Sequence, residues 1–173
     1  MHTAQLTVLK AAVFSFVTIV LSFPTFEDFL TPVRDYFQLV NTVYHPETHT
    51  KSVFAPLHLH NWALFQLLNK PAFSQAFVDA MPFSTFAVTY TVLSQTGDND
   101  LVYAFFHVVW LLTFNRTLIE HDFPENLIPI FSAVMLKVKV ERITRIILLI
   151  LTNLIKIDWY VRLLIQHDYT RII

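Results

Sequence analysis

The sequence predicts an all-α fold, an armadillo/HEAT-like helical-repeat solenoid, and three observations support this prediction. The 173-residue chain contains one glycine, Gly97, whereas strand-rich and Gly-loop folds need glycine at many tight turns. Hydrophobic residues make up 54% of the chain, with 17 phenylalanines, which is typical of extensive helix packing. Similar helical segments also recur at a spacing near 40 residues, the period of armadillo and HEAT repeats.

The internal repeat consists of an apolar helix, a polar break and a shorter amphipathic helix. Its three recognisable copies start at Leu64, Val108 and Leu148. Leu111–Asn115 and Ile150–Leu154 occupy matching positions 39 residues apart. In a solenoid, one helix of each repeat lies between neighbouring repeats and is therefore apolar nearly all round.

We expect a single domain over residues 1–173, with no second, C-terminal domain. Solenoids of this kind present extended helical faces to their partners. The irregular repeats are placed at roughly 1–50, 51–97, 98–137 and 138–173.

The first half of the chain is expected to form helices separated by polar or proline-containing breaks. Thr25, followed three residues later by Asp28, is a candidate N-cap for the second helix. Tyr44–Lys51 (YHPETHTK) is expected to be a polar linker. The last segment is rich in Thr, Val and Phe, so its composition also suits a strand. The expected segments are Thr3–Ser22, Phe26–Val43, Leu57–Leu68, Ala72–Asp79 and Pro82–Ser94.

The second half begins at the clearest turn in the sequence, Gln95–Asp100 (QTGDND). Asp98 or Asn99 can cap the helix that follows, and Asn115 can cap the next one. A proline-containing break, FPEN, separates the shorter helix from the remaining three. The expected helices are Leu101–Phe114, Arg116–Asp122, Leu127–Leu136, Val140–Ile155 and Asp158–His167.

The apolar segment near the N-terminus, Leu6–Phe23, has more than one interpretation. Lys10 is followed by thirteen uncharged residues, a pattern that suits the apolar region of a signal peptide. The run is shorter than the roughly 20 residues of a membrane span, and Pro24 ends it. We favour a core helix of a soluble bundle, with a signal peptide or a membrane segment as the alternatives.

Composition and motifs argue against an enzyme or a nucleic-acid-binding protein. The net charge of −1 provides no basic field, and the chain has no cysteine. Nucleophile-elbow, P-loop and zinc-protease motifs do not occur in the sequence. Glu120, His121 and Asp122 are adjacent, and adjacent residues of a helix do not face one another. We therefore predict no catalytic residues, no cofactor and no metal.

Histidines cluster around the predicted linker, at His45, His49, His58 and His60. Pro46 argues against a helix that would place the first pair on one face. The two-residue spacing of the second pair suits a strand. Structural zinc sites usually show tighter paired spacing, so we favour a solvated linker over a metal site.

A basic edge precedes the apolar part of the helix predicted at Val140–Ile155. It consists of Lys137, Lys139, Arg142 and Arg145. Glu141 lies four residues before Arg145, a spacing that allows an ion pair along one helix face. We predict that this edge binds an acidic partner, the alternative being an ordinary solvated helix start.

Residues Val108–Ile155 resemble the H subunit of the eukaryotic vacuolar (V-type) proton-pumping ATPase. Four sequence elements carry the resemblance, in the order and near the spacing of that family. They are the tryptophan-led helix Trp110–Phe114, the helix opening Asn126–Pro129, the K-x-K-x-x-R-I-x-L-like segment Lys139–Leu148, and Asn153–Leu154.

The resemblance implies a non-catalytic subunit of the V1 sector on the cytoplasmic face of vacuolar or endosomal membranes. In that family the subunit bridges peripheral stalk subunits E and G and the N-terminal domain of membrane subunit a. It supports coupled proton pumping, and its N-terminal domain is an armadillo/HEAT-like solenoid. A separate C-terminal domain silences ATP hydrolysis by the detached cytosolic sector. We expect no such domain here, so this silencing role is not carried over.

Thr152 departs from the family, which often has a basic residue there. Three alternatives remain beside the pump subunit. One is a general helical-repeat adaptor outside this complex. Another is a small membrane protein with Thr3–Phe23 and Leu101–Phe114 as spans. The third is a secreted helical protein glycosylated at Asn115, within the acceptor pattern Asn115-Arg116-Thr117.

Overall fold

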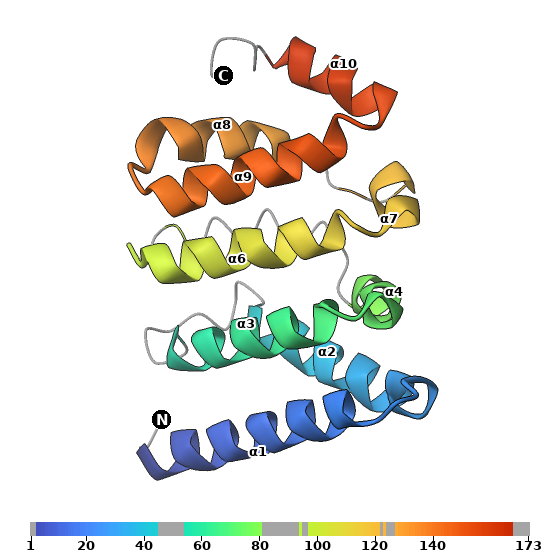
Figure 1. Cartoon of the computed structure of the whole chain (residues 1–173). Helices are drawn as coiled ribbons and strands as arrows, with labels where there is room; N and C mark the ends of the chain where they lie inside the picture. The colour runs from blue at the N-terminus through green and yellow to red at the C-terminus, as the bar shows by residue number, and fades with distance from the viewer. Residues whose placement is uncertain are drawn as a thin grey trace. The chain divides into compact units, whose positions relative to one another are not determined.

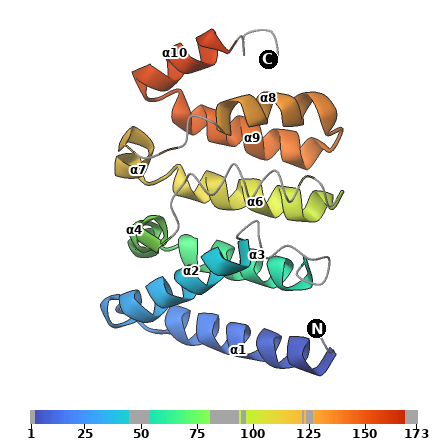
Figure 2. The same cartoon turned by 180° about the vertical axis from the view of Figure 1, so that it is seen from behind.

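The computed structural model describes residues 3–44, 54–80, 94, 97–121, 123 and 127–167. Every regular element within these ranges is helical (Figures 1 and 2), so the all-α class is confirmed, and the solenoid stays a prediction. The chain divides into two compact units, Met1–Pro82 and Phe83–Ile173. Each unit has its own packed core.

The first unit is built on two helix pairings. Helix α2 packs against α4, and α1 packs against α3. The ring of Phe37 in α2 meets Phe77 in α4 edge-on, with their centroids 5.1 Å apart, and both side chains are fully buried. The elements are α1 (Thr3–Ser22), the 3₁₀ turn η1 (Glu27–Phe29), α2 (Leu30–Tyr44), α3 (Phe54–Leu68) and α4 (Pro71–Ala80).

The entry into α2 differs from the sequence prediction. Phe26, rather than Thr25, occupies the N-cap position of η1, and it makes no side-chain capping bond. The Phe26 ring packs edge-on against Phe73, with centroids 5.3 Å apart. The predicted Thr25 cap is therefore wrong, because aromatic packing sets this turn and α2 begins only at Leu30.

Helix α1 is far more exposed than the predicted core helix. Its buried side chains are Val13, Val17 and Val20, which form one stripe. Because the rest of its surface is not buried in the first unit, the prediction that this segment is a core helix is wrong. The stripe faces a single main neighbour, α3. Among the described helices, Ala4–Ser22 alone is long and apolar enough to cross a membrane, by length and composition. Core helices and signal sequences also meet that criterion.

Two histidines of the predicted cluster lie in α3 and not in a strand. His58 is exposed and His60 is buried, because residues two apart on a helix point to different sides. The described residues contain no group of three or more metal-ligating side chains. His45, His49 and the segment predicted at 82–93 lie outside the described residues.

A buried polar pair joins α2 and α3. The Tyr36 hydroxyl lies 2.9 Å from Nδ1 of His60. Burial lowers the pKa of His60 to about 4, so the imidazole is neutral at physiological pH. With its proton on Nε2, the ring accepts the hydrogen bond from Tyr36 at Nδ1.

The second unit contains α6 (Asn99–Leu112), α7 (Arg116–His121), α8 (Leu127–Lys137), α9 (Glu141–Leu154) and α10 (Asp158–Gln166). Helix α9 packs against both α6 and α8, and Figure 1 shows the three helices layered together. Phe106 of α6 and Phe131 of α8 are fully buried and meet edge-on, 5.9 Å between centroids. The core of this unit therefore joins all three helices.

Two polar contacts show that α6 and α9 run in the same direction. Arg142 near the start of α9 pairs with Asp100 near the start of α6. Asn153 near the end of α9 donates to the hydroxyl of Thr113, which follows the end of α6. The parallel course is visible in both views (Figures 1 and 2), and it is the arrangement expected of equivalent helices in successive repeats.

The predicted alternation of long and short helices is confirmed at three places. Helix α3 is followed by the shorter α4, α6 by α7, and α9 by α10. Two of the predicted caps are also present. The Asp98 carboxylate accepts from the backbone N–H groups of Asp100 and Leu101, directly after Gly97, whose φ is +69°. The Asn115 side chain accepts from the N–H of Leu118 at 3.2 Å.

Candidate partner-binding surface

The predicted basic edge surrounds the connection between α8 and α9. Lys137 ends α8, Lys139 lies in the connection, and Arg142 and Arg145 belong to the first turns of α9. All four side chains are exposed. The structure thus brings the four predicted residues to one end of α9.

Helix α9 presents this edge because the helix is amphipathic. Its apolar stripe follows the helical period and is buried against α6 and α8: Ile143, Ile146, Ile147, Ile150, Leu151 and Leu154. Leu148 and Leu149 are exposed, so the prediction that this helix is enclosed between neighbouring repeats on every side is wrong. Leu149 lies four residues after Arg145, on the same face. The basic edge therefore continues into an apolar patch along α9.

The four cations differ in how they are held. Arg142 pairs with Asp100, and its guanidinium lies 5.2 Å from the centroid of the Tyr103 ring. Arg145 pairs with Glu141 at 2.5 Å, as predicted from their spacing. Within the described part of the chain, Lys137 and Lys139 have no ion-pair partner. The two lysines are therefore the cations best placed to meet a carboxylate of another protein.

The far end of α9 is fixed by a chain of hydrogen bonds. Lys156 Nζ donates to Asn153 Oδ1 at 3.1 Å. Asn153 Nδ2 donates to Thr113 Oγ1 at 2.8 Å, and this hydroxyl donates to the carbonyl of Trp110 at 2.6 Å. Asn153 and Thr113 are both buried, so these hydrogen bonds satisfy polar groups that would otherwise be costly to bury.

Replacing Asn153 with alanine tests this structural role. The change removes the link to Thr113 and the acceptor for Lys156, so we expect the free energy of unfolding to fall by about 1–3 kcal/mol. Urea denaturation of the full chain is the measurement. Thr152→Ala is the matched control, because the Thr152 hydroxyl is exposed and bonds only within α9. Equal losses from the two variants would contradict the role assigned to Asn153.

A family model described as the H subunit of the V-ATPase matches residues 4–173. The chain belongs to the V-ATPase H-subunit family.

No curated protein and no solved structure matches the chain. Membership in the H-subunit family makes the chain a regulatory component of a V-ATPase, an assembly with other subunits. Proteins of this family are non-catalytic and belong to the peripheral V1 complex of vacuolar membranes. The match also covers the first half of the chain, outside the segment Val108–Ile155 that carries the sequence resemblance.

The sequence analysis of this H-family protein did not predict the hydrogen bonds among Lys156, Asn153 and Thr113 at the end of α9. The sequence did contain a signal for them. The 39-residue repeat aligns Thr113 with Thr152, which directly precedes Asn153, so the ends of the two helices were expected to be equivalent. The Tyr36–His60 pair had no such signal, since its members are 24 residues apart in different helices. Of the predicted Glu120-His121-Asp122 group, Glu120 pairs with Arg116 at 2.6 Å, and the Asp122 position lies outside the described residues.

Proposed function

We propose that the chain is a non-catalytic assembly and regulatory subunit of the V1 sector. It bridges the peripheral stalk and the membrane sector and so supports coupled ATP-driven proton transport. Its partners are stalk subunits E and G and the N-terminal domain of membrane subunit a, at the cytoplasmic face of vacuolar or endosomal membranes. The observation that carries this proposal is the family match over residues 4–173.

The geometry of α9 supports a role in binding. A basic edge next to exposed Leu148 and Leu149 combines charge with apolar area, the composition that protein interfaces use for orientation and affinity. The chain has no active site of its own in this proposal, and its contribution to pumping is mechanical. It holds the peripheral stalk and the membrane sector together while ATP is hydrolysed elsewhere in the complex.

Co-purification tests the proposal. A tagged chain expressed in its native cells is expected to bring down stalk subunits E and G together with membrane subunit a, in constant proportions. A stable preparation that lacks subunits E and G would contradict the proposal and would favour a general helical-repeat adaptor.

Charge reversal tests the basic edge in the same assembly. Lys137→Glu combined with Lys139→Glu is expected to lower the affinity of the chain for the rest of the pump about 10-fold, since reversed charges repel an acidic surface. The readout is the concentration of chain needed to rebind pump depleted of it. Arg162→Glu, at an exposed position of α10, is the matched control. The edge is not the binding surface if both variants rebind like the unmodified chain.

A membrane-inserted protein is the second candidate, and helix α1 is the observation that favours it. Ala4–Ser22 has the length and composition of a span. Extraction of membranes with alkaline carbonate separates the two candidates. A peripheral pump subunit is released into the supernatant, and a chain anchored through α1 stays with the lipid.

A further inference from the structure

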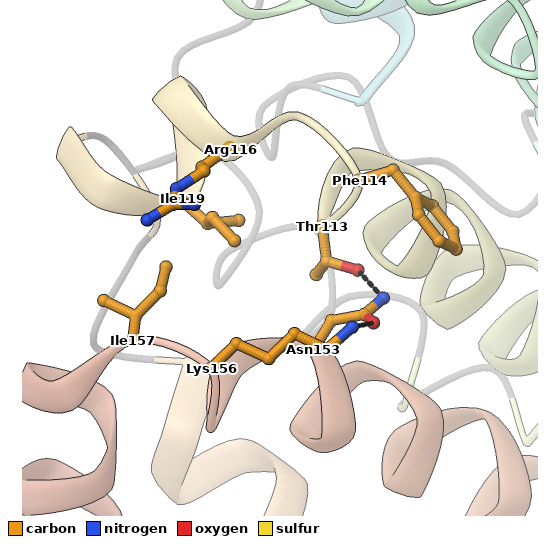
Figure 3. Close-up of a pocket in the computed structure, with 7 residues that line it drawn as sticks. All are labelled: Thr113, Phe114, Arg116, Ile119, Asn153, Lys156 and Ile157. Carbon is orange, nitrogen blue, oxygen red and sulfur yellow. Dashed lines mark hydrogen bonds between the residues drawn. The ribbon is translucent and has the colours of Figure 1, made fainter.

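A second candidate binding site lies at the end of α9 opposite the basic edge. It is a hollow of about 190 Å³ between the turn that follows α6 and the turn that follows α9 (Figure 3). Among the described residues, its lining contains two cations and no carboxylate. The lining residues are Thr113, Phe114, Arg116, Ile119, Asn153, Lys156 and Ile157.

The lysine of the hollow is held in place by the chain of hydrogen bonds described above. Each bond runs in the same direction, from Lys156 to Asn153, from Asn153 to Thr113 and from Thr113 to the carbonyl of Trp110. An ammonium group has three N–H donors, and the amide of Asn153 takes one. A ligand therefore meets a cation that is already oriented, which lowers the entropic cost of binding.

The second cation stands on the opposite wall in Figure 3. Arg116 uses its Nε to pair with Glu120, 2.6 Å away, and this bond raises the pKa of the guanidinium. The Arg116 side chain is 83% exposed. The terminal nitrogens of its planar fork are the donors that suit a carboxylate.

Apolar side chains complete the hollow. Phe114 is 62% exposed, and its ring is supported edge-on by Trp110, with centroids 5.0 Å apart. Ile119 and Ile157 lie on the other side of the hollow (Figure 3). An inorganic anion would leave these apolar surfaces uncovered, whereas a peptide covers both kinds of surface at once.

We propose that this hollow binds an acidic segment of a partner polypeptide. A carboxylate of that segment meets the Lys156 ammonium, and a second acidic side chain meets Arg116. An apolar side chain between them rests on Phe114. The partner is another subunit of the pump, so this inference rests on the proposed function, but it concerns a different surface from the basic edge.

A zero-length carbodiimide reagent gives the sharpest test, because it joins a lysine to a carboxylate only where the two are in contact. The purified pump that contains the full chain is treated and then digested for mass spectrometry. We expect Lys156 joined by an amide bond to an Asp or Glu of another subunit. Links from Lys156 only to carboxylates of its own chain, or no link while Lys156 remains open to acetylation in the pump, would overturn the proposal.

Substitutions provide a second readout. Lys156→Gln combined with Arg116→Gln is expected to weaken rebinding to depleted pump about 10-fold. Lys156→Arg keeps the charge and should rebind nearly like the unmodified chain. Circular dichroism melting of each variant identifies any loss that comes from unfolding. Unchanged rebinding of the double variant counts against the hollow.

The two proposals fail in different ways. If the unmodified chain does not co-purify with the pump, the proposed function fails, and the partner inferred for the hollow fails with it. If the chain co-purifies but Lys156 remains open to acetylation and forms no link to another subunit, the proposed function stands and only the hollow is wrong.

Discussion

Ile147→Ala is expected to lower the free energy of unfolding of the second unit by about 2–5 kcal/mol. Ile147 is fully buried at the middle of α9, where the helix packs against α6 and α8. Truncation removes apolar surface from the core and leaves a cavity, because a close-packed interior relaxes only in part. Urea denaturation followed through Trp110 and Trp159, both of which belong to this unit, measures the loss.

Leu149→Ala is the matched control for that substitution. Leu149 lies in the same helix two residues later and is 47% exposed, so its truncation is expected to change stability by no more than about 0.5 kcal/mol. If Leu149→Ala costs as much as Ile147→Ala, the amphipathic orientation of α9 is wrong. Leu149→Ala should instead affect binding to the pump, because the exposed leucine extends the basic edge.

Acidification is expected to destabilise the first unit through His60. The pKa of this buried imidazole is about 4, against an ordinary value of 6.5. Between pH 6.5 and 4 the unfolded chain binds a proton at His60 and the folded chain does not. Stability attributable to His60 is therefore complete above pH 6.5 and is lost as pH falls to 4, by about 3 kcal/mol in total.

Amide hydrogen exchange of α2 and α3 measures this loss, because it reports the opening of one region of the full chain. His60→Gln removes the titrating group and keeps a side-chain oxygen that can accept from Tyr36. Between pH 6.5 and 4, the free energy of opening of this variant should fall by about 3 kcal/mol less than that of the unmodified chain. His58→Gln, in the same helix at an exposed position, should leave the pH dependence unchanged. A steep fall that persists in His60→Gln would exclude His60 as its cause.

Much of the helical layout could be predicted because the signals for it are local. The turn before Asn99 contains the chain's only glycine and the capping carboxylate of Asp98, and the structure places both as expected. The ends of α1 were predicted to the residue, since Pro24 and a run of apolar residues define that segment. The alternation of long and short helices followed from the repeat, because its period can be found by aligning the sequence with itself.

The errors arose where distant residues decide the local structure. Phe26 displaces Thr25 from the cap position because its ring packs against Phe73, more than forty residues away. Apolar residues in α1 and α9 were expected to be buried on every side, but composition does not reveal how many neighbours a helix has. Burial of His60 depends on contact with Tyr36 of another helix, which no pattern within α3 indicates.

The candidate site was predictable in part. The basic edge follows from the sequence alone, because four cations within nine residues at a helix start are exposed in almost any fold. The hollow is different, since it combines Thr113 and Phe114 from one turn with Asn153 and Lys156 from another. These turns come together only because α6 and α9 lie side by side in the same direction.

The most direct test of the central claim is a cryo-electron microscopy structure of the pump purified through a tag on this chain. The account predicts density for the chain on the cytoplasmic side, in contact with stalk subunits E and G and the N-terminal domain of membrane subunit a. The Lys137–Arg145 edge should face an acidic surface of one of them. A tag that recovers the chain without the pump, or a chain whose helix α1 lies within the lipid away from the stalk, would contradict the account.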